Sequence, residues 1–406
     1  MGFYTGGITA AKGFRAAGVH CGVRPNKKKN DLALIVSDVP CAASGLFTRN
    51  KVKADPVLLD METIRDGKGQ AIVANSGIAN ACAPHGMEHA KTMQKLAAEA
   101  LNIDPSLVFV GSTGVIGQEL PIDKIQAGIP EVCKALTYDD TGSDEAAHAI
   151  MTTDTKKKEL AIRTGIDGQI VTIGGISKGS GMIHPNLGTM LCYLTTDVNI
   201  SAEMLKAALK EVCDQTFNRI SVDGDTSTND SLIILANGLA GNIKIETRNE
   251  SYQLFVQALK ELCTELARRM AADGEGAKHL ITCTVSGADN EKDAETLSKS
   301  VIGSTLTKAA IFGCDANWGR VLCALGYSGV DFDPEKVDVT FVSKAGSVPV
   351  CKNGRGLDFD EDLASKVLHE PEVIIDVSMH EGDASVTCWG CDITYDYIKI
   401  NGDYRT

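Results

Sequence analysis

The chain has 406 residues, enough for two or three ordinary domains and a large core. Its formal net charge of −13 disfavours nucleic acid and anionic membranes as main partners, because both bind basic faces. No apolar run reaches the roughly 18 residues of a transmembrane helix, and the first residues do not have the pattern of a secretory signal. The thirteen scattered cysteines favour reduced thiols over a disulfide framework, so we expect a cytoplasmic protein.

The first half of the chain alternates between strand and helix patterns. Apolar runs with turn residues after them predict buried strands at 32–36 and 71–74. Residues 87–101 repeat apolar side chains every three or four positions, which indicates an amphipathic helix. A strand at 107–110 runs into a glycine-rich stretch, 111–117. We expect a loop there, whose backbone N–H groups point at an anion.

The second half continues the alternation. Helices are predicted at 202–217, 252–270 and 294–312, and strands at 190–194, 232–235, 279–285, 337–342, 373–379 and 384–394. No internal repeat and no long linker interrupts the pattern. The fold class is therefore α/β or α+β, with layered sheets.

The stretch 178–197 lies near the middle of the chain and changes character at Gly188-Thr189. It begins polar and glycine-rich, and from Met190 it reads as a buried strand. A strained bond at the mouth of a strand can break if Thr189 attacks the preceding carbonyl and the resulting ester hydrolyses. The new α-amine, with a reference pKa of about 7.7–8.0, could then take the proton of the threonine hydroxyl. The alternative is a threonine that merely starts a strand.

Three other motifs have a chemical and a structural interpretation. His85 and His89 match the H-x-x-E-H pattern of zinc peptidases, but a proline precedes them and the pattern is short. Cys388 and Cys391 form a CxxC without a second pair, which is more typical of two core cysteines. Residues 174–181 resemble a phosphate loop, although the lysine precedes the final glycines instead of following them.

Many motifs resemble, in order and spacing, the ornithine acetyltransferases of arginine biosynthesis, also called glutamate N-acetyltransferases. The resemblance covers essentially the whole chain, which makes it far more specific than any single motif. The segments that carry it are 6–18, 112–117, 150–155, 178–197, 217–230, 273–277, 314–320 and 401–406.

The resemblance implies an αββα sandwich with a smaller C-terminal α/β part. It implies self-cleavage between Gly188 and Thr189 into an α chain, 1–188, and a β chain, 189–406, usually assembled as α2β2. The implied reaction moves an acetyl group from N2-acetylornithine to glutamate through an acetyl-threonine enzyme. No metal or organic cofactor is implied, and the use of acetyl-CoA as a second acetyl donor stays open.

The resemblance also assigns site residues. Thr189 is the nucleophile, and Thr113 and Gly114 form the oxyanion hole at a strand-to-loop turn. The substrate-binding positions are Thr153, Lys178, Thr189, Glu275, Asn401 and Thr406. A lysine suits the α-carboxylate of either amino acid, and an ionised glutamate suits an ammonium. Three alternatives stay open: Thr152 or Thr155 in place of Thr153, a solvated turn for Glu275, and a frayed tail at the C-terminus.

The chain departs from the family pattern at three places. Gly188 stands where many relatives have alanine, His184 stands where a small residue is common, and the lysines 156–158 replace a stretch that contains proline. His184 would contact either the substrate or only solvent. A further group resembles a metal site by composition, but we expect turn and capping residues there: Asp223, Asp225, Asn229 and Asp230.

Two other functions remain as alternatives to acetyl transfer. One is a related self-processing amidohydrolase or aminopeptidase, which would hydrolyse its acyl-enzyme. The other is a non-catalytic phosphate-binding protein that uses the loop around Lys178. A zinc enzyme built on His85 and His89 is a third, weaker alternative.

Overall fold

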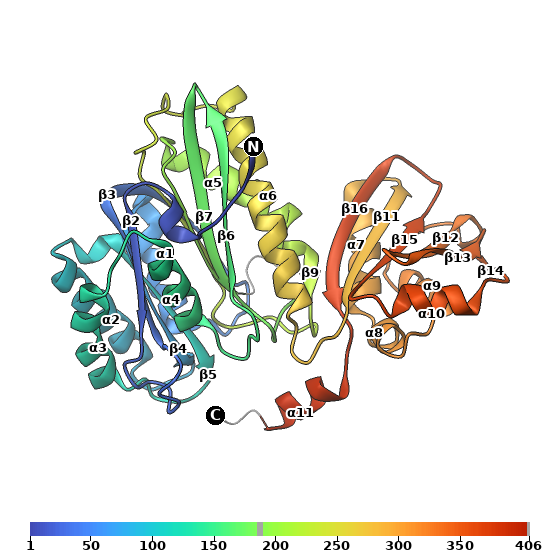
Figure 1. Cartoon of the computed structure of the whole chain (residues 1–406), viewed down its shortest axis with the longest axis horizontal. Helices are drawn as coiled ribbons and strands as arrows, with labels where there is room; N and C mark the ends of the chain where they lie inside the picture. Colours follow the sequence, from blue (N-terminus) through green and yellow to red (C-terminus); the bar gives the residue numbers. More distant parts are fainter. Residues whose placement is uncertain (185–189, 404–406) are drawn as a thin grey trace.

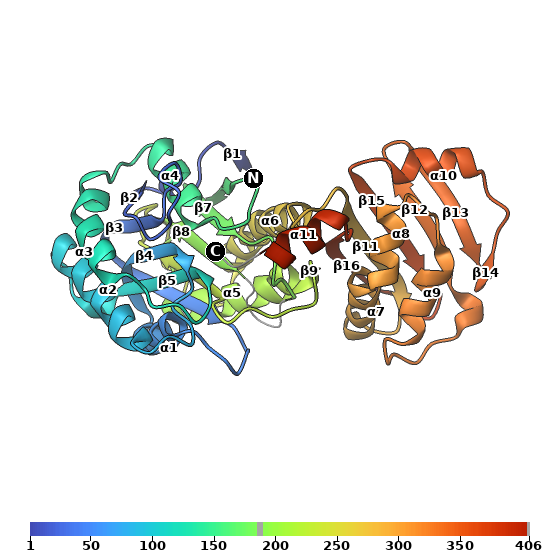
Figure 2. The same cartoon turned by 90° about the horizontal axis from the view of Figure 1, so that it is seen from below.

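The computed structural model describes residues 1–184 and 190–403. Within these ranges the chain forms a larger unit around a nine-stranded sheet and a smaller C-terminal unit around a seven-stranded sheet (Figure 1). The last helix, α11 (Tyr395–Asp403), leaves the smaller unit and returns along the larger one (Figure 2). In the described part of the chain, no helix is both long and apolar enough to span a bilayer.

One long strand joins the two layers of the larger unit. The sheet runs in the order β1 (Gly2–Tyr4), β6 (Lys158–Ile166), β7 (Gln169–Lys178), β8 (Leu191–Thr196), β10 (Ser231–Ala236), β3 (Leu32–Phe47), β4 (Lys68–Ile78) and β5 (Val108–Val115), and β2 (Phe14–Val19) also pairs with β3. The register of β3 against β4 shifts between Val36 and Cys41. Before the shift β3 pairs with β2, and after it β3 pairs with β10.

Alternating side chains show that the two parts of this sheet lie face to face. On β8, Leu191 and Tyr193 share one core with Phe109 of β5, whereas Cys192 and Leu194 belong to a second core. Neighbouring residues of a strand point to opposite faces, so the first core lies between two strand layers. A third core lies on the outer face of β3, β4 and β5. The αββα sandwich is therefore confirmed.

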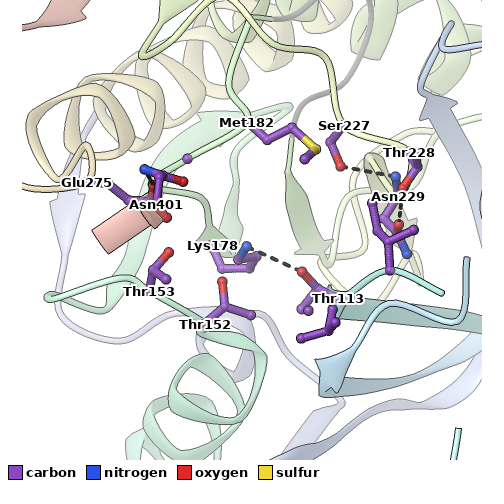
Figure 3. A pocket seen from close by; sticks show the side chains of 14 residues that line it. Thr113, Thr152, Thr153, Lys178, Met182, Ser227, Thr228, Asn229, Glu275 and Asn401 are labelled. Carbon is purple, nitrogen blue, oxygen red and sulfur yellow. Dashed lines mark hydrogen bonds between the residues drawn. The ribbon is translucent and has the colours of Figure 1, made fainter. Parts of the chain in front are cut away.

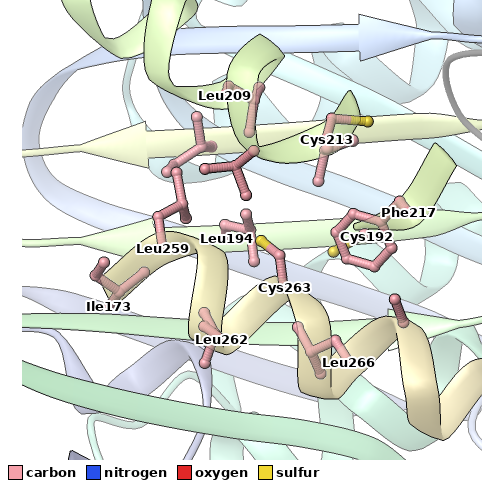
Figure 4. Packing of buried hydrophobic residues seen from close by; sticks show 14 of the residues in the cluster. Ile173, Cys192, Leu194, Leu209, Cys213, Phe217, Leu259, Leu262, Cys263 and Leu266 are labelled. Atoms are coloured by element: carbon pink, nitrogen blue, oxygen red, sulfur yellow. The ribbon is translucent and has the colours of Figure 1, made fainter. Parts of the chain in front are cut away.

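Helices cover both outer faces of the sandwich. Against β3, β4 and β5 lie α1 (Asp55–Thr63), α2 (Gly86–Leu101) and α3 (Ile122–Lys134). Helix α4 (Asp140–Ile150) instead packs on β2 and contributes its buried side chains to the core between the two layers. The other face carries α5 (Ala202–Gln215) and α6 (Glu250–Ala272), whose apolar side chains meet the strands in Figure 4. Ser201 and Asn249 begin α5 and α6 by accepting a backbone N–H with their side chains, which satisfies donors of the first turn.

The smaller unit confirms the expected C-terminal α/β part. Its sheet runs in the order β14 (Arg355–Gly356), β13 (Gly346–Lys352), β12 (Asp338–Ser343), β15 (Glu372–Ser378), β11 (Leu280–Ala288), β16 (Ala384–Cys391) and β9 (Ile220–Ser221). Its helices are α7 (Glu291–Gly303), α8 (Thr305–Phe312), α9 (Trp318–Gly326) and α10 (Glu361–Leu368). Strand β9 comes from the segment after α5, so the small sheet extends back into the larger unit.

Several predicted elements differ from the structure. The single helix at 294–312 is two helices, because the Ser304 side chain accepts the Thr307 N–H and begins α8. The last strand ends at Cys391 instead of residue 394. The resemblance of residues 174–181 to a phosphate loop does not hold in their first half, because Gly174 to Lys178 lie within β7. A Cβ on Gly174 would come within 1.9 Å of the Gly7 carbonyl oxygen, so close packing requires this glycine.

The surroundings of the cysteine and histidine motifs favour a structural role over a chemical one. Cys388 and Cys391 are buried in β16 and belong to two different cores, as expected of core cysteines. His85 and His89 lie at the start of α2, with their Nδ1 atoms 3.0 Å and 3.3 Å from Glu119 Oε1. Neither histidine lines the cavity described below. Among residues 1–184 and 190–403, no cluster of three or more His, Cys, Asp or Glu side chains is arranged to hold a metal ion.

Candidate active site

A cavity of about 300 Å³ lies where the ends of β5 and β7 meet the segments before β10 and after α6. It is lined by Thr113, Gly114, Val115, Ile116, Thr152, Thr153, Lys178, Gly181, Met182, Ser227, Thr228, Asn229, Glu275 and Asn401. The sequence separation of these residues is large, yet the fold brings together every predicted site residue that the structure describes. The volume suits one small molecule, such as an amino-acid derivative.

The proposed nucleophile, Thr189, is close in the sequence to residues that line this cavity, such as Met182. Gly188, Thr189 and Thr406 lie outside the described residues, so their predicted roles stay predictions. Met190, the residue after Thr189, lines a smaller space of about 20 Å³. Lys178 and Thr113 line both spaces, so the start of β8 lies beside the cavity.

Thr113 and Gly114 lie within β5, not in the loop that we expected after residue 110. They pair in parallel with Ser76 and Gly77 of β4. Gly114 has φ +133°, and a Cβ there would lie 2.2 Å from the Gly77 carbonyl carbon. The backbone is therefore irregular at this point although the hydrogen-bonded strand continues. Only glycine fits this combination of φ and close backbone approach.

Replacing Gly114 with alanine should destabilise the protein by about 1–3 kcal/mol, because the new Cβ combines backbone strain with overpacking against fixed backbone atoms. Thermal and urea unfolding would measure the change. Gly165→Ala is the matched control, since a Cβ at this other strand glycine meets nothing within 4 Å and its φ is not positive. Equal stability of the two variants would contradict the account given for Gly114.

Lys178 ends β7 and directs its ammonium group into the middle of the cavity (Figure 3). Burial lowers the pKa of Lys178, and the negative charge of Asp154 opposes part of that effect. Among the residues that the structure describes, its ammonium makes one hydrogen bond, a long one of 3.4 Å to Thr113 Oγ1. Toward the described part of the chain, the donors of this buried cation are thus mostly uncommitted, and it suits an anionic group of a ligand.

A carboxylate lies at the end of the cavity away from Thr113 (Figure 3). Glu275 follows α6, and its backbone N–H donates to the Ser180 carbonyl at 2.8 Å. The Asn401 side chain of α11 donates to Glu275 Oε2 at 2.7 Å. A Cβ on Gly181 would approach the Glu275 carboxylate to 2.5 Å, so the glycine makes room for it. Glu275 is buried and therefore not a solvated turn residue.

The structure separates the three candidate threonines. Thr152 and Thr153 line the cavity, and Thr153 Oγ1 lies 2.7 Å from Ser180 Oγ. Thr155 instead hydrogen-bonds Asp273 through its backbone N–H and its hydroxyl. Thr155 is therefore a structural residue, whereas both other threonines are in place to contact a ligand.

One wall of the cavity was not predicted from the sequence. Ser227, Thr228 and Asn229 line it, and the Asn229 amide donates to the carbonyls of Ala79 and Ser112 at 2.6 Å and 2.8 Å. Asn229 thereby ties the segment before β10 to the end of β5. The only sequence signal was the run of small polar residues, which suggested turns and caps and gave no direction for any side chain.

The acidic residues near this wall have separate roles. Asp223 accepts the backbone N–H groups of Met182 and Ile183 at 2.6 Å and 2.9 Å, as expected of a turn residue. Asp230 is fully buried beside the smaller space, and burial raises its pKa well above the usual range. His184 does not line the cavity; its Nδ1 lies 3.0 Å from Ser221 Oγ, and it borders an open groove between α5 and α7.

Fold and cavity together define an αββα protein with a cavity for a small molecule, lined by a buried lysine and a buried glutamate. The sequence profile of the ArgJ family matches residues 15–406. The chain is 51% identical, over the whole of both chains, to the arginine biosynthesis bifunctional protein ArgJ of Symbiobacterium thermophilum. It is 50% identical, again over both whole chains, to the protein of that name from Caldanaerobacter subterraneus subsp. tengcongensis.

Two solved structures are similar as well. An arginine biosynthesis bifunctional protein of Bacillus halodurans is 42% identical with a TM-score of 0.50, over 52% of this chain and 98% of that chain. The ornithine acetyltransferase of Mycobacterium tuberculosis, complexed with ornithine, is 41% identical with a TM-score of 0.43, over 46% of this chain and 98% of that one. The chain belongs to the ArgJ family. It is an acetyltransferase of arginine biosynthesis.

Proposed function

We propose that the chain cleaves itself between Gly188 and Thr189 and then uses Thr189 to move an acetyl group from N2-acetylornithine to glutamate. The observation that carries the proposal is the convergence of Lys178, Glu275 and Thr113 on one cavity, beside a smaller space that Met190 lines together with Lys178 and Thr113. Thr189 is bonded to Met190, so the proposed nucleophile is one residue along the chain from a residue that lines this smaller space.

The length of a solved relative supports the cleavage. The Bacillus halodurans chain is covered almost whole, yet it matches only 52% of this chain. A β chain of residues 189–406 would be 218 of 406 residues, or about 54%. A separate chain of that size is what cleavage before Thr189 produces. The two products would form the domains 1–188 and 189–406, and we propose that they assemble as α2β2.

Acetyl transfer would proceed in two halves. The Thr189 hydroxyl attacks the acetyl carbonyl of N2-acetylornithine, while the Thr189 α-amine takes the hydroxyl proton. The tetrahedral oxyanion is held by Thr113 and Gly114, and its collapse returns the proton to the leaving nitrogen and releases ornithine. The amine of glutamate then attacks the acetyl-threonine ester. This second step forms N-acetylglutamate and restores the free hydroxyl.

Charge placement in the cavity fits these substrates. Both amino acids carry an α-carboxylate, for which Lys178 is the buried cation. Ornithine carries an ammonium at the far end of its side chain, and Glu275 with Asn401 supplies an acceptor there. Thr153 adds a hydroxyl between the two ends, and Thr406 would add a contact from the C-terminus. A single cavity could therefore hold the donor and then the acceptor.

The second activity of the relatives called bifunctional suggests that acetyl-CoA also serves as an acetyl donor. We propose this as a second route to the same acetyl-Thr189 enzyme, without a metal or bound organic cofactor. All thirteen cysteines are free and eight of them are buried in the cores, which fits a reducing compartment such as the cytoplasm.

Denaturing mass spectrometry of the purified protein tests the proposal. We expect two chains, the second beginning at Thr189, and a mass increase of one acetyl group on the second chain after incubation with N2-acetylornithine. Addition of glutamate should remove that acetyl group as N-acetylglutamate. An intact chain with full activity would refute the self-made nucleophile. Release of free acetate without N-acetylglutamate would favour the amidohydrolase alternative.

A further inference from the structure

Lys158 is the third residue of a run of lysines, yet it is almost completely buried at 1% exposure. Its neighbour Lys157 lies at the surface and pairs with Asp144 and Glu159. Lys158 Nζ instead lies 2.6 Å from Asp154 Oδ1 and 2.6 Å from Asp273 Oδ2. A buried lysine between two buried aspartates forms a closed ionic cluster, which no feature of the sequence predicted.

The cluster lies directly behind the cavity. Asp154 also accepts the backbone N–H of Gly179 at 2.8 Å and that of Thr152 at 3.1 Å. Gly179 is the residue after Lys178, so Asp154 reaches the same turn that carries the cavity lysine. Burial raises the pKa of Asp154, but the charges of Lys158 and Lys178 outweigh it and hold the pKa well below its usual range. Asp154 is therefore an anion within the influence of two lysines.

Only one of these two lysines pairs with Asp154. Among the residues that the structure describes, Lys178 makes no ion pair, and its ammonium contacts Thr113 at 3.4 Å. The charged groups that act on Lys178 are Asp154, Lys158, Asp230 and Glu275. If Lys158 were absent, Asp154 would be a buried anion without its ion-pair partner, and Lys178 would be the nearest cation able to neutralise it.

We propose that Lys158 is an internal counter-ion that occupies Asp154 and Asp273 and thereby leaves Lys178 uncommitted to bind a substrate carboxylate. Lys158 is a positioning residue, since it does not line the cavity and acts through Lys178. The inference rests on the proposed role of Lys178 toward the α-carboxylate of N2-acetylornithine. The inference explains why Lys178, although buried, keeps its hydrogen-bond donors available for a ligand.

Steady-state kinetics of Lys158→Met tests the inference. We expect kcat/KM for N2-acetylornithine to fall about ten-fold, because Lys178 is drawn to Asp154, while kcat falls less than about three-fold. Lys157→Met is the matched control, and it should change neither constant because Lys157 lies at the surface. An unchanged kcat/KM in Lys158→Met would overturn the inference.

A second variant separates this role from simple support of the fold. In the double variant Lys158→Met/Asp154→Asn, the anion that competes for Lys178 is removed together with its counter-ion. We expect kcat/KM to return to within about three-fold of wild type. A double variant as slow as Lys158→Met, or slower, would mean that the lysine only holds the structure together.

Asp154→Asn alone provides a readout that does not need Lys158→Met to fold. Asp154 raises the pKa of Lys178, so its removal should lower that pKa further. Lys178 would then lose its charge at lower pH, and the alkaline limb of kcat/KM should move to lower pH. An unmoved limb would overturn the inference. Failure of the proposed function is distinguishable, because wild type itself would then remain uncleaved and transfer no acetyl group.

Discussion

Thr189→Ala should leave the purified protein as one chain of 406 residues and should reduce acetyl transfer on the order of 10⁴-fold or more. The variant lacks the hydroxyl that would attack the Gly188 carbonyl, so no new N-terminus forms. It also lacks the oxygen that would carry the acetyl group, so both halves of the reaction lose their covalent intermediate. Denaturing mass spectrometry and an assay for N-acetylglutamate would measure the two effects.

Thr189→Ser is the informative control for this prediction. Serine keeps the hydroxyl and, after cleavage, the α-amine, so we expect cleavage and measurable transfer at altered rates. Cleavage of Thr189→Ala at the same bond would show that another group cuts the chain. Acetyl transfer by an uncleaved Thr189→Ala at the wild-type rate would remove Thr189 from the mechanism altogether.

Lys178→Met should lower kcat/KM for N2-acetylornithine by about 10²–10³-fold, because losing one member of a buried charge pair costs about 3–4 kcal/mol. The methionine keeps the apolar stem and removes only the ammonium, so the fold should survive. The loss should fall mainly on substrates that carry an α-carboxylate. Comparing N2-acetylornithine with its α-amide would isolate that contribution.

The same variant separates two interpretations of Lys178. If the lysine binds the carboxylate, Lys178→Met should process the α-amide about as well as wild type does. If it instead acts on the reacting carbonyl through Thr113, both substrates should slow equally. Lys157→Met again serves as the control for removing one positive charge from this part of the chain.

Local sequence patterns predicted most of the secondary structure. Strands in the cores, such as the one from Leu191, are continuous apolar runs, and helices such as α6 repeat apolar residues at helical spacing. The predictions failed where tertiary contacts decide the backbone. Gly174 lies in a strand because β6 and β8 pair with it on either side, and β5 continues past residue 110 because β4 pairs with it up to Val115.

The residues of the candidate site came from the resemblance of the whole chain to a family, not from any local pattern. The structure then placed Thr113, Lys178 and Glu275 around one cavity, although they come from distant segments. It also identified residues that the sequence did not mark. Asn229 and Lys158 read as a turn amide and as part of a charge run, and only their contacts reveal an anchor for the cavity wall and a buried counter-ion.

The sequence by itself determined the fold class, the family and the position of the Gly188-Thr189 bond, because periodicity and ordered motifs are written along the chain. The tertiary structure alone decided that Thr155 contacts Asp273 instead of the cavity, that Asn229 anchors one cavity wall and that Lys158 is buried. The physical reason is that burial and pairing depend on neighbours distant in sequence. Lys157 and Lys158 are adjacent and chemically identical, yet one is solvated at the surface and the other neutralises two buried aspartates behind the site.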